Sequence, residues 1–333
     1  MSSMIFGGAG DIKIFCASAS RKLAYAIVEH LGLKMGDSVA SRFDDGEINM
    51  KVYETVRGCD VFIIQATSPP VNDHLMELLI MTDAMRRSSA GRITVVVPYF
   101  GYARQDRRAQ SHDPISAKLV ADLITKAGAN RILTMDLHAP QIQGFFNIPM
   151  DHLRGIFIFA NYCKEHFDDL SDIVVVSPDL GSVSRCNAFA NILDVPLAIV
   201  DKRRPKDNES EVAHFIGDVR NKYAILVDDQ IASGGSLANA ATTIMEHGAK
   251  GVMACVTHPV LCGNATRRIQ ESALDKLLVL DTIYVPYTKQ QECPKIEVLS
   301  VAPFFGDAIR CIHTSQSIGD LFSRIGGSDR EEG

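Results

Sequence analysis

The sequence predicts an α/β protein built from two tandem units, each a mainly parallel sheet with helices on both faces. The first observation is length: 333 residues exceed what one ordinary hydrophobic core holds, so two domains are expected. The second is a strand-then-helix alternation along the chain, which is typical of a parallel sheet covered by helices. The third is an internal repeat, because GANRILTMDLH at 128–138 and GAKGVMACVTH at 248–258 share one register.

The elements follow in order from the hydrophobic pattern. A strand is predicted at 12–17 and a helix at 21–31, whose apolar positions Leu23, Ala24, Ile27, Val28 and Leu31 share one face. Short β-branched runs predict further buried strands at 61–65, 93–98, 132–135, 173–176, 197–200, 224–227 and 252–257. Helices are predicted at 116–127 and 236–247, which extends the repeat, and a closing helix is predicted at 308–322.

Composition excludes several classes of protein. A net charge of -6 argues against a nucleic-acid partner. The eight cysteines form no C-x-x-C pair, so neither a zinc site nor a disulfide framework is indicated, and a reducing cytoplasm fits. No signal peptide is visible, and the longest apolar runs are well below the roughly 20 residues that span a bilayer. We therefore expect a cytoplasmic protein with small-molecule partners, no nucleic acid and no membrane.

The most informative stretch is 224–236, AILVDDQIASGGS. It is predicted to be a buried strand that ends at Asp228 and Asp229, then a loop that folds tightly at Gly234 and Gly235. Ser236 is predicted to be the N-cap of the following helix. Backbone N–H groups and serine hydroxyls at a helix N-terminus suit a phosphate monoester, and the carboxylates suit vicinal hydroxyls. Ribose 5-phosphate has this form, although a ligand-free turn before a capped helix stays open.

In the first unit the segment 98–114, PYFGYARQDRRAQSHDP, leaves the carboxyl end of a buried strand, where open α/β sheets bind ligands. It combines aromatic faces with cations, which suits a nucleoside triphosphate. The alternative is a solvated basic loop. The aromatic residues are Tyr99, Phe100 and Tyr102, and the cations are Arg104, Arg107 and Arg108.

Three weaker signals lie elsewhere. The stretch 42–47 is a turn with one aromatic ring and three acidic residues. His138 and Asp179 each follow a buried strand; both could be ordinary strand-end polar groups, and as a pair they would suit Mg²⁺. The polar run 201–211 is predicted to be a loop, either a solvated connection or a mobile lid.

Taken together, these motifs resemble the ribose-phosphate pyrophosphokinase family, also called phosphoribosyl pyrophosphate synthetases, of the phosphate-activated bacterial class. The resemblance covers about 12–322 and includes RFDDGE, NDHLMELLIMTDAMRR, PYFGYARQDRR, PISAKLVADLI, MDLHAPQIQGFF, DKRRPK and LSVAP. It implies two phosphoribosyltransferase-like domains, at 10–155 with a closing helix at 304–323 and at 156–303, followed by a disordered tail at 324–333. It also implies transfer of the diphosphoryl group of MgATP to ribose 5-phosphate.

The resemblance assigns roles residue by residue. It implies catalytic roles for Lys202 and Arg204 on the lid, and Mg²⁺ ligation by His138 and Asp179. Ribose 5-phosphate binding carries over to Asp228, Asp229, Ser233, Gly234, Gly235 and Ser236. ATP binding carries over to Phe43, Asp45, Glu47, Arg104, Gln105 and His138. Arg57, Gln143 and His112 carry over as effector-site residues, with phosphate and ADP as the effectors and a homohexamer as the assembly.

Three positions depart from the family pattern. Ala232 stands where a third aspartate is usual in the ribose loop, Ser182 replaces a glycine, and His112 replaces an arginine. Two other functions stay open. A phosphoribosyltransferase would share the ribose loop but would not need the tandem unit, and a non-catalytic regulatory paralogue would be expected to lose the lid lysine or the metal positions.

Overall fold

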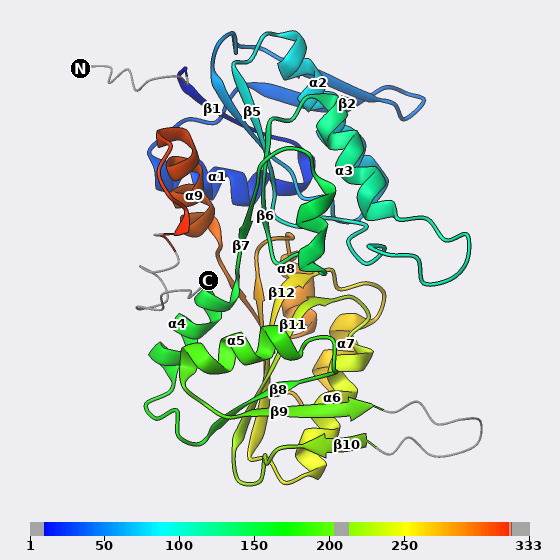
Figure 1. The fold of residues 1–333 in the computed structure, drawn as a ribbon, viewed down its shortest axis with the longest axis vertical. Coiled ribbons are helices and arrows are strands. Elements are labelled where there is room, and N and C mark those ends of the chain that lie inside the picture. The colour runs from blue at the N-terminus through cyan, green and yellow to red at the C-terminus, as the bar shows by residue number, and fades with distance from the viewer. Residues whose placement is uncertain (1–9, 203–212, 320, 322–333) are drawn as a thin grey trace. The chain divides into compact units, whose positions relative to one another are not determined.

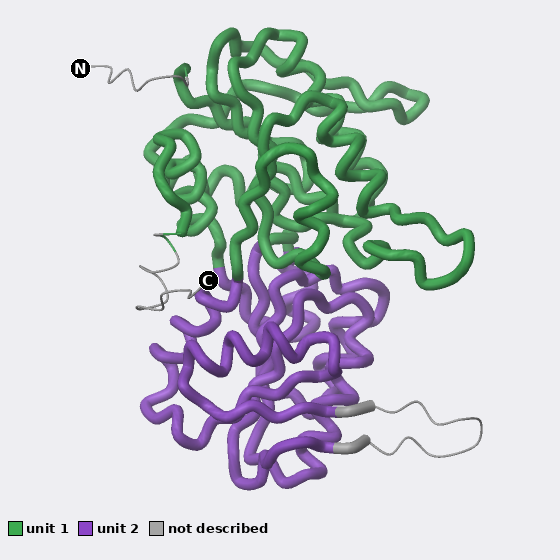
Figure 2. Tube along the Cα trace, viewed as in Figure 1, with its two compact units in different colours: residues 1–154, 282–284, 300–321 green, residues 155–281, 285–299, 322–333 purple. Residues whose placement is uncertain are grey.

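Two separate sheets organise the chain (Figure 1). The computed structural model describes residues 10–202, 213–319 and 321, without the side chains of residues 201, 202, 213 and 214. The described residues divide into two compact units (Figure 2). Unit 1 comprises those within 1–154, 282–284 and 300–321, and unit 2 comprises those within 155–281 and 285–299. The division into domains at residue 155 stays a prediction.

Unit 1 contains a five-stranded parallel sheet with strand order β1-β4-β5-β6-β7, and a separate antiparallel hairpin of β2 and β3. Its strands are β1 (Ile12–Cys16), β2 (Ser38–Arg42), β3 (Ile48–Val52), β4 (Asp60–Ile64), β5 (Arg92–Val97), β6 (Arg131–Met135) and β7 (Met150–Leu153). Its helices are α1 (Arg21–Leu31), α2 (Val71–Arg87), α3 (Ser116–Ala127) and α9 (Ala302–Thr314), with short 3₁₀ turns η1 (Ser18–Ser20) and η2 (Pro140–Phe145).

Unit 2 contains a seven-stranded sheet with order β10-β9-β8-β11-β12-β13-β14, in which only β10 runs antiparallel to its neighbour within the described chain. Its strands are β8 (Ile173–Ser177), β9 (Leu197–Lys202), β10 (Ala213–Ile216), β11 (Tyr223–Ile231), β12 (Gly251–Pro259), β13 (Lys276–Leu280) and β14 (Ile296–Leu299). Its helices are α4 (Ile156–His166), α5 (Val183–Leu193), α6 (Gly235–Glu246), α7 (Ala265–Glu271) and α8 (Tyr287–Glu292).

Burial explains why these residues form strands. Every residue of β4, β8 and β12 is buried, as expected for strands covered on both faces by helices. In unit 1, α1 packs with α9 and α2 packs with α3, and in unit 2, α4 packs with α5 and α6 with α7. The predicted α/β class with helices on both faces is therefore confirmed, and α3–β6 and α6–β12 are the repeated pieces.

Some predicted boundaries are wrong. Strand β11 does not end at Asp228 but continues to Ile231, because its backbone stays paired with β12 up to Pro259. The closing helix α9 begins at Ala302 and ends at Thr314, because Ser315 adopts a left-handed φ of 56°. Strands β2, β3, β7, β10, β13 and β14 were not among the predicted strands. The predicted tail at 324–333 lies outside the described residues.

No helix among the described residues is long and apolar enough to cross a membrane.

Candidate active site

The loop after β11 has the geometry of a phosphate cradle. Gly234 precedes α6 with a left-handed φ of 77°, and Ser236 is the second residue of the helix. The prediction that Ser236 is the N-cap is therefore wrong: glycine adopts the left-handed conformation without steric cost, so Gly234 is the N-cap and the helix begins at Gly235, two residues earlier than predicted. The N–H groups in the first turn of a helix have no intrahelical acceptor, which makes this end of α6 a position suited to an anion. Ser233 and Ser236 are exposed beside them.

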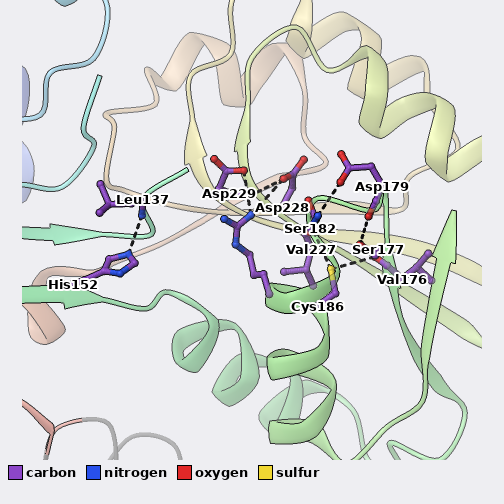
Figure 3. Close-up of polar contacts among 11 residues, drawn as sticks. Leu137, His152, Val176, Ser177, Asp179, Ser182, Cys186, Val227, Asp228 and Asp229 are labelled. Carbon is purple, nitrogen blue, oxygen red and sulfur yellow. Dashed lines mark hydrogen bonds and ion pairs between the residues drawn. The ribbon is translucent and has the colours of Figure 1, made fainter. Parts of the chain in front are cut away.

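The carboxylates of Asp228 and Asp229 lie at the carboxyl end of β11 (Figure 3). The backbone N–H of Asp229 donates to Asp228 Oδ1 at 2.9 Å. Arg185, on α5, donates from Nη1 to Asp229 Oδ1 at 3.1 Å and lies 3.6 Å from Asp228 Oδ1. The side chain of Asp229 is only 7% exposed, so this arginine neutralises a carboxylate that would be costly to leave unpaired.

Burial raises the pKa of Asp228, and the adjacent charge of Asp229 raises it further. The guanidinium of Arg185 opposes this shift without cancelling it. The two carboxylates therefore resist being ionised together in the ligand-free protein, and a cation or a hydroxyl donor beside them would favour the fully ionised pair.

This raised pKa predicts a pH dependence of stability. A carboxyl with a raised pKa in the folded state binds protons more tightly than in the unfolded chain, so its stabilisation is present at low pH and lost as the pH rises through the folded-state value. We expect the contribution of Asp228 to the free energy of unfolding to fall between about pH 4, near the unfolded-state pKa, and about pH 7, near the folded-state pKa, by about 1.4 kcal/mol for each unit of pKa elevation spanned. Urea titrations of the wild-type protein and Asp228→Asn measure the difference.

The control is Asp218→Asn. Asp218 is exposed, and hydrogen bonds from Arg220 lower its pKa, so its contribution is constant above about pH 5. We expect this variant to keep the wild-type pH slope and Asp228→Asn to flatten it. Equal slopes for the wild-type protein and Asp228→Asn would contradict the prediction.

Asp179 follows β8, the strand beside β11, and lies along the same sheet edge (Figure 3). The backbone N–H of Ser182 donates to Asp179 Oδ1 at 2.9 Å, which closes the turn into α5. A Cβ on Gly181 would lie 3.3 Å from that oxygen. Ser182 has φ -91°, a conformation open to any residue, so serine fits this departure from the family pattern without strain.

Lys202 is the last residue of β9 and pairs with Ala213 of β10. Because β9, β8 and β11 run parallel, the backbone of Lys202 lies at the same sheet edge as the residues that follow β8 and β11. Arg204 and the rest of the predicted lid up to 211 lie outside the described residues.

In unit 1, the predicted turn with Phe43, Asp45 and Glu47 joins β2 and β3, a hairpin that the sequence analysis did not predict. The ring of Phe43 is 53% exposed, and the turn is closed by Asp45 Oδ1, which accepts from the N–H of Glu47 at 3.0 Å. Arg42 donates to Asp73 of α2 at 3.0 Å, so the hairpin is tied to that helix. Its aromatic ring is presented to solvent.

The segment after β5 only partly matches its predicted role. Arg104 and Gln105 are exposed, and so are the other two arginines of the segment. Phe100, however, is 2% exposed and packs edge-to-face on Phe146, with ring centroids 5.8 Å apart. The prediction that Phe100 offers a ring to a ligand is wrong, because the ring is part of the hydrophobic core of unit 1.

His138 is exposed in the turn after β6. The preceding residue, Leu137, donates its backbone N–H to Nε2 of His152 at 2.9 Å (Figure 3). Asp136, which is buried, has a left-handed φ of 36°. A strained, hydrogen-bonded turn thus presents His138 at the carboxyl edge of the unit 1 sheet.

The three predicted effector residues do not gather at one edge of the unit 1 sheet. His112 and Gln143 follow β5 and β6, whereas Arg57 precedes β4 and bridges to Ala90, which precedes β5. Arg57 therefore lies at the opposite edge. All three side chains are exposed.

Of the two predicted metal ligands, Asp179 fits Mg²⁺ in type, because Mg²⁺ prefers oxygen donors, whereas His138 offers a nitrogen. Asp179 is an exposed carboxylate, and Mg²⁺ typically keeps several waters and takes one or two carboxylates plus substrate phosphates. No group of three metal-binding side chains occurs in the described part of the chain. His138 belongs to unit 1 and Asp179 to unit 2.

Two residues of the site were missed in the sequence. Arg185 is the third residue of α5, and a positive charge near the N-terminus of a helix is unfavourable because of the helix dipole. Its position in the sequence therefore indicated that an acidic side chain compensates it. His152 carried no such local signal, because its bond to Leu137 joins two segments through the pairing of β6 with β7.

Comparisons with known proteins agree with the geometry. The family model described as the N-terminal domain of ribose phosphate pyrophosphokinase matches residues 12–128. The model described as a phosphoribosyl synthetase-associated domain matches residues 212–323.

Similar proteins span nearly the whole chain. A ribose-phosphate pyrophosphokinase of Clostridium tetani is 55% identical over 313 residues, which are 94% of this chain and 97% of that protein. One from Corynebacterium ammoniagenes is 49% identical over 313 residues, 94% of this chain and 98% of that protein. The crystal structure of phosphoribosylpyrophosphate synthetase from Mycobacterium smegmatis matches with a TM-score of 0.87 and 40% identity, covering 92% of this chain and 99% of that one. The chain therefore belongs to the ribose-phosphate pyrophosphokinase family.

Proposed function

We propose that the protein transfers the diphosphoryl group of MgATP to O1 of ribose 5-phosphate, giving 5-phosphoribosyl 1-diphosphate and AMP for nucleotide biosynthesis. The ribose oxygen attacks the β-phosphorus, the bond from that phosphorus to the oxygen of the α-phosphate breaks, and the hydroxyl proton passes to solvent. Such a transfer needs alignment and nearby cations more than covalent chemistry from the protein.

We assign the sugar-phosphate site to unit 2 and most of the nucleotide site to unit 1. Asp228 and Asp229 accept hydrogen bonds from the ribose hydroxyls, while 233–236 bind the 5-phosphate. Phe43 stacks on adenine, and Asp45, Glu47, Arg104, Gln105 and His138 complete the nucleotide site. Mg²⁺, when bound by Asp179 and His138, would neutralise phosphate charge. Lys202 and Arg204 would stabilise the transferring group.

The observation that carries the proposal is the edge of the unit 2 sheet. The adjacent parallel strands β8, β9 and β11 end at the same edge of the sheet. This edge carries Asp179, the backbone of Lys202 and the Asp228–Asp229 pair, and beside them lies a loop suited to a phosphate monoester. A regulatory paralogue would be expected to lose the metal or lid positions, and the sequence retains all of them. A phosphoribosyltransferase is disfavoured because the relatives match both units over nearly their full length.

The direct test is AMP release from MgATP with and without ribose 5-phosphate. Release that requires ribose 5-phosphate supports the proposed reaction. Release without it, or no release with both substrates, would contradict it.

We further propose that the protein is a cytoplasmic homohexamer regulated by phosphate and ADP. The nucleotide site would then be completed by the exposed Phe43 turn of a second subunit, and the effector site by Arg57 from one subunit with His112 and Gln143 from another. Arg57 lies at the opposite sheet edge from the other two, which is compatible with a site shared between copies. His112 is shorter than the usual arginine and only partly charged near neutral pH, which weakens the expected response to phosphate.

An apolar stripe formed by α3 and its N-cap residue supports association between copies. Ile115, Leu119 and Leu123 are spaced four residues apart and are 38%, 60% and 40% exposed. We expect Leu119→Asp to shift the protein to smaller species in sedimentation velocity, because a buried charge in an apolar interface is costly. Met245→Asp, a similar change on α6, is the control and should sediment as the wild type. A wild-type enzyme that is fully active as a monomer would contradict the hexamer.

A further inference from the structure

Hydrogen bonds from one segment, residues 261–268, support the strand-to-helix loop at 231–234. The backbone N–H of Leu261 donates to the carbonyl of Ile231 at 2.9 Å, and that of Cys262 donates to the carbonyl of Ala232 at 2.8 Å. The next carbonyl, that of Ser233, accepts from Nη1 of Arg268 at 3.2 Å. Three consecutive carbonyls of the loop therefore bond to the same supporting segment.

This pattern orients the loop. Carbonyls that bond to the supporting segment do not face an anion on the other side, so the loop turns its carbonyl oxygens away from the ligand side. The segment also contacts the loop at Gly234, where a Cβ would lie 3.4 Å from the carbonyl oxygen of Ala265, an ordinary van der Waals distance. The glycine and the three hydrogen bonds together fix where the phosphate cradle opens.

Arg268 differs from the other two donors because it carries a charge. Its Nη1 would lie 3.9 Å from a Cβ on Gly235, the first residue of α6, and Ser233 Oγ would lie at the same distance from that point. The guanidinium has five N–H donors, and the bond to Ser233 uses one of them. Arg268 is exposed, so its charge stays next to the loop without the cost of burial.

The charge matters because the rest of this sheet edge is acidic. Asp179, Asp228 and Asp229 lie along it, and the guanidinium of Arg185 is engaged by the aspartate pair. A phosphate monoester carries about -1.5 to -2 charges near pH 7 and is repelled by such an edge. A cation fixed to the loop backbone offsets that repulsion at the phosphate end.

We propose that Arg268 is a positioning residue for the phosphate group of the sugar phosphate: it fixes the Ser233 carbonyl and holds a positive charge beside the start of α6. This inference rests on the proposed function of the loop as the ribose 5-phosphate site. It assigns to α7 a role in substrate affinity.

The test compares Arg268→Ala, Arg268→Gln and Arg268→Lys with wild type. We expect Arg268→Ala to raise the KM for ribose 5-phosphate roughly 10-fold, the lower end for a charge-assisted hydrogen bond, with the KM for ATP and kcat nearly unchanged. Arg268→Lys should recover part of the affinity, whereas Arg268→Gln, which keeps a donor but no charge, should resemble alanine.

The matched control is Arg267→Ala. Arg267 is the preceding residue of the same helix, and its Nε donates to Glu271 at 2.8 Å on the exposed surface. It should leave both KM values unchanged. An unchanged KM for ribose 5-phosphate in Arg268→Ala would overturn the proposal, as would equal increases for both substrates or wild-type behaviour of Arg268→Gln. A wild-type enzyme that releases no AMP would instead contradict the proposed function, and calorimetric binding of ribose 5-phosphate to the same variants would still test Arg268.

Discussion

Lys202→Ala is expected to lower kcat by about 10²–10³ while changing the KM of either substrate little. A cation that meets negative charge only as it develops stabilises the transition state and not the bound substrates, so its loss appears in kcat. Removing one such contact typically costs this much in rate. Steady-state kinetics with ATP and ribose 5-phosphate varied separately would measure the split.

The fold places the backbone of Lys202 at the edge of the unit 2 sheet. Lys202 ends β9, which lies beside β8, and β8 lies beside β11. Its backbone therefore belongs to the sheet edge that carries Asp179 and the proposed ribose 5-phosphate loop. The side chain of Lys202 and the whole of Arg204 fall outside the described residues, so kinetics is the appropriate test.

A control cation is available at the other end of the same sheet. Arg220 precedes β11, and its side chain is 75% exposed. Arg220→Ala should leave kcat unchanged, because the amino ends of the parallel strands face away from the proposed chemistry. If Lys202→Ala kept the wild-type kcat, the segment after β9 would be a solvated connection and not a catalytic lid.

Ala232→Asp is expected to lower the KM for ribose 5-phosphate by about 10–150-fold. A hydrogen bond to a charged acceptor contributes roughly 1.5–3 kcal/mol, and this protein lacks the aspartate that is usual in the family at this loop position. Ala232 follows β11 directly, is partly exposed, and has its carbonyl fixed by the N–H of Cys262 at 2.8 Å. The backbone of the loop is thus already held in place for the new side chain.

The same substitution should make activity depend more steeply on Mg²⁺. The pKa of Asp228 is already raised by burial and by Asp229, so a third carboxylate adds like-charge repulsion that a divalent cation would offset. Ala232→Asn is the matched control, because it supplies an acceptor of the same shape without charge. It should lower the KM less and leave the Mg²⁺ dependence unchanged.

The KM for ATP should stay near the wild-type value in both variants. An unchanged KM for ribose 5-phosphate in Ala232→Asp would contradict the prediction. Asp228 and Asp229 would then suffice for binding, and alanine in place of the usual aspartate would not weaken substrate affinity.

The sequence alone determined the class of fold and the positions of the loops. Parallel strands covered on both faces are mostly apolar, so the central residues of β4, β8 and β12 were visible as apolar runs. The ribose loop was visible because a tight turn into a helix needs glycine and short hydroxyl side chains, and these are local requirements. The repeat indicated two units because the helix and strand of each copy keep the same spacing, although the loops before the two helices differ in sequence.

Only the tertiary structure decided which side chains support those loops. Arg185 reaches Asp229 across 44 residues, and Arg268 reaches Ser233 across 35. Both contacts depend on the strand order of unit 2, which a list of strands does not contain. The burial of Phe100 and the place of Arg57 at the far edge of its sheet were likewise decided by packing and topology, because neighbouring residues in the sequence can face a ligand, the core or the opposite edge.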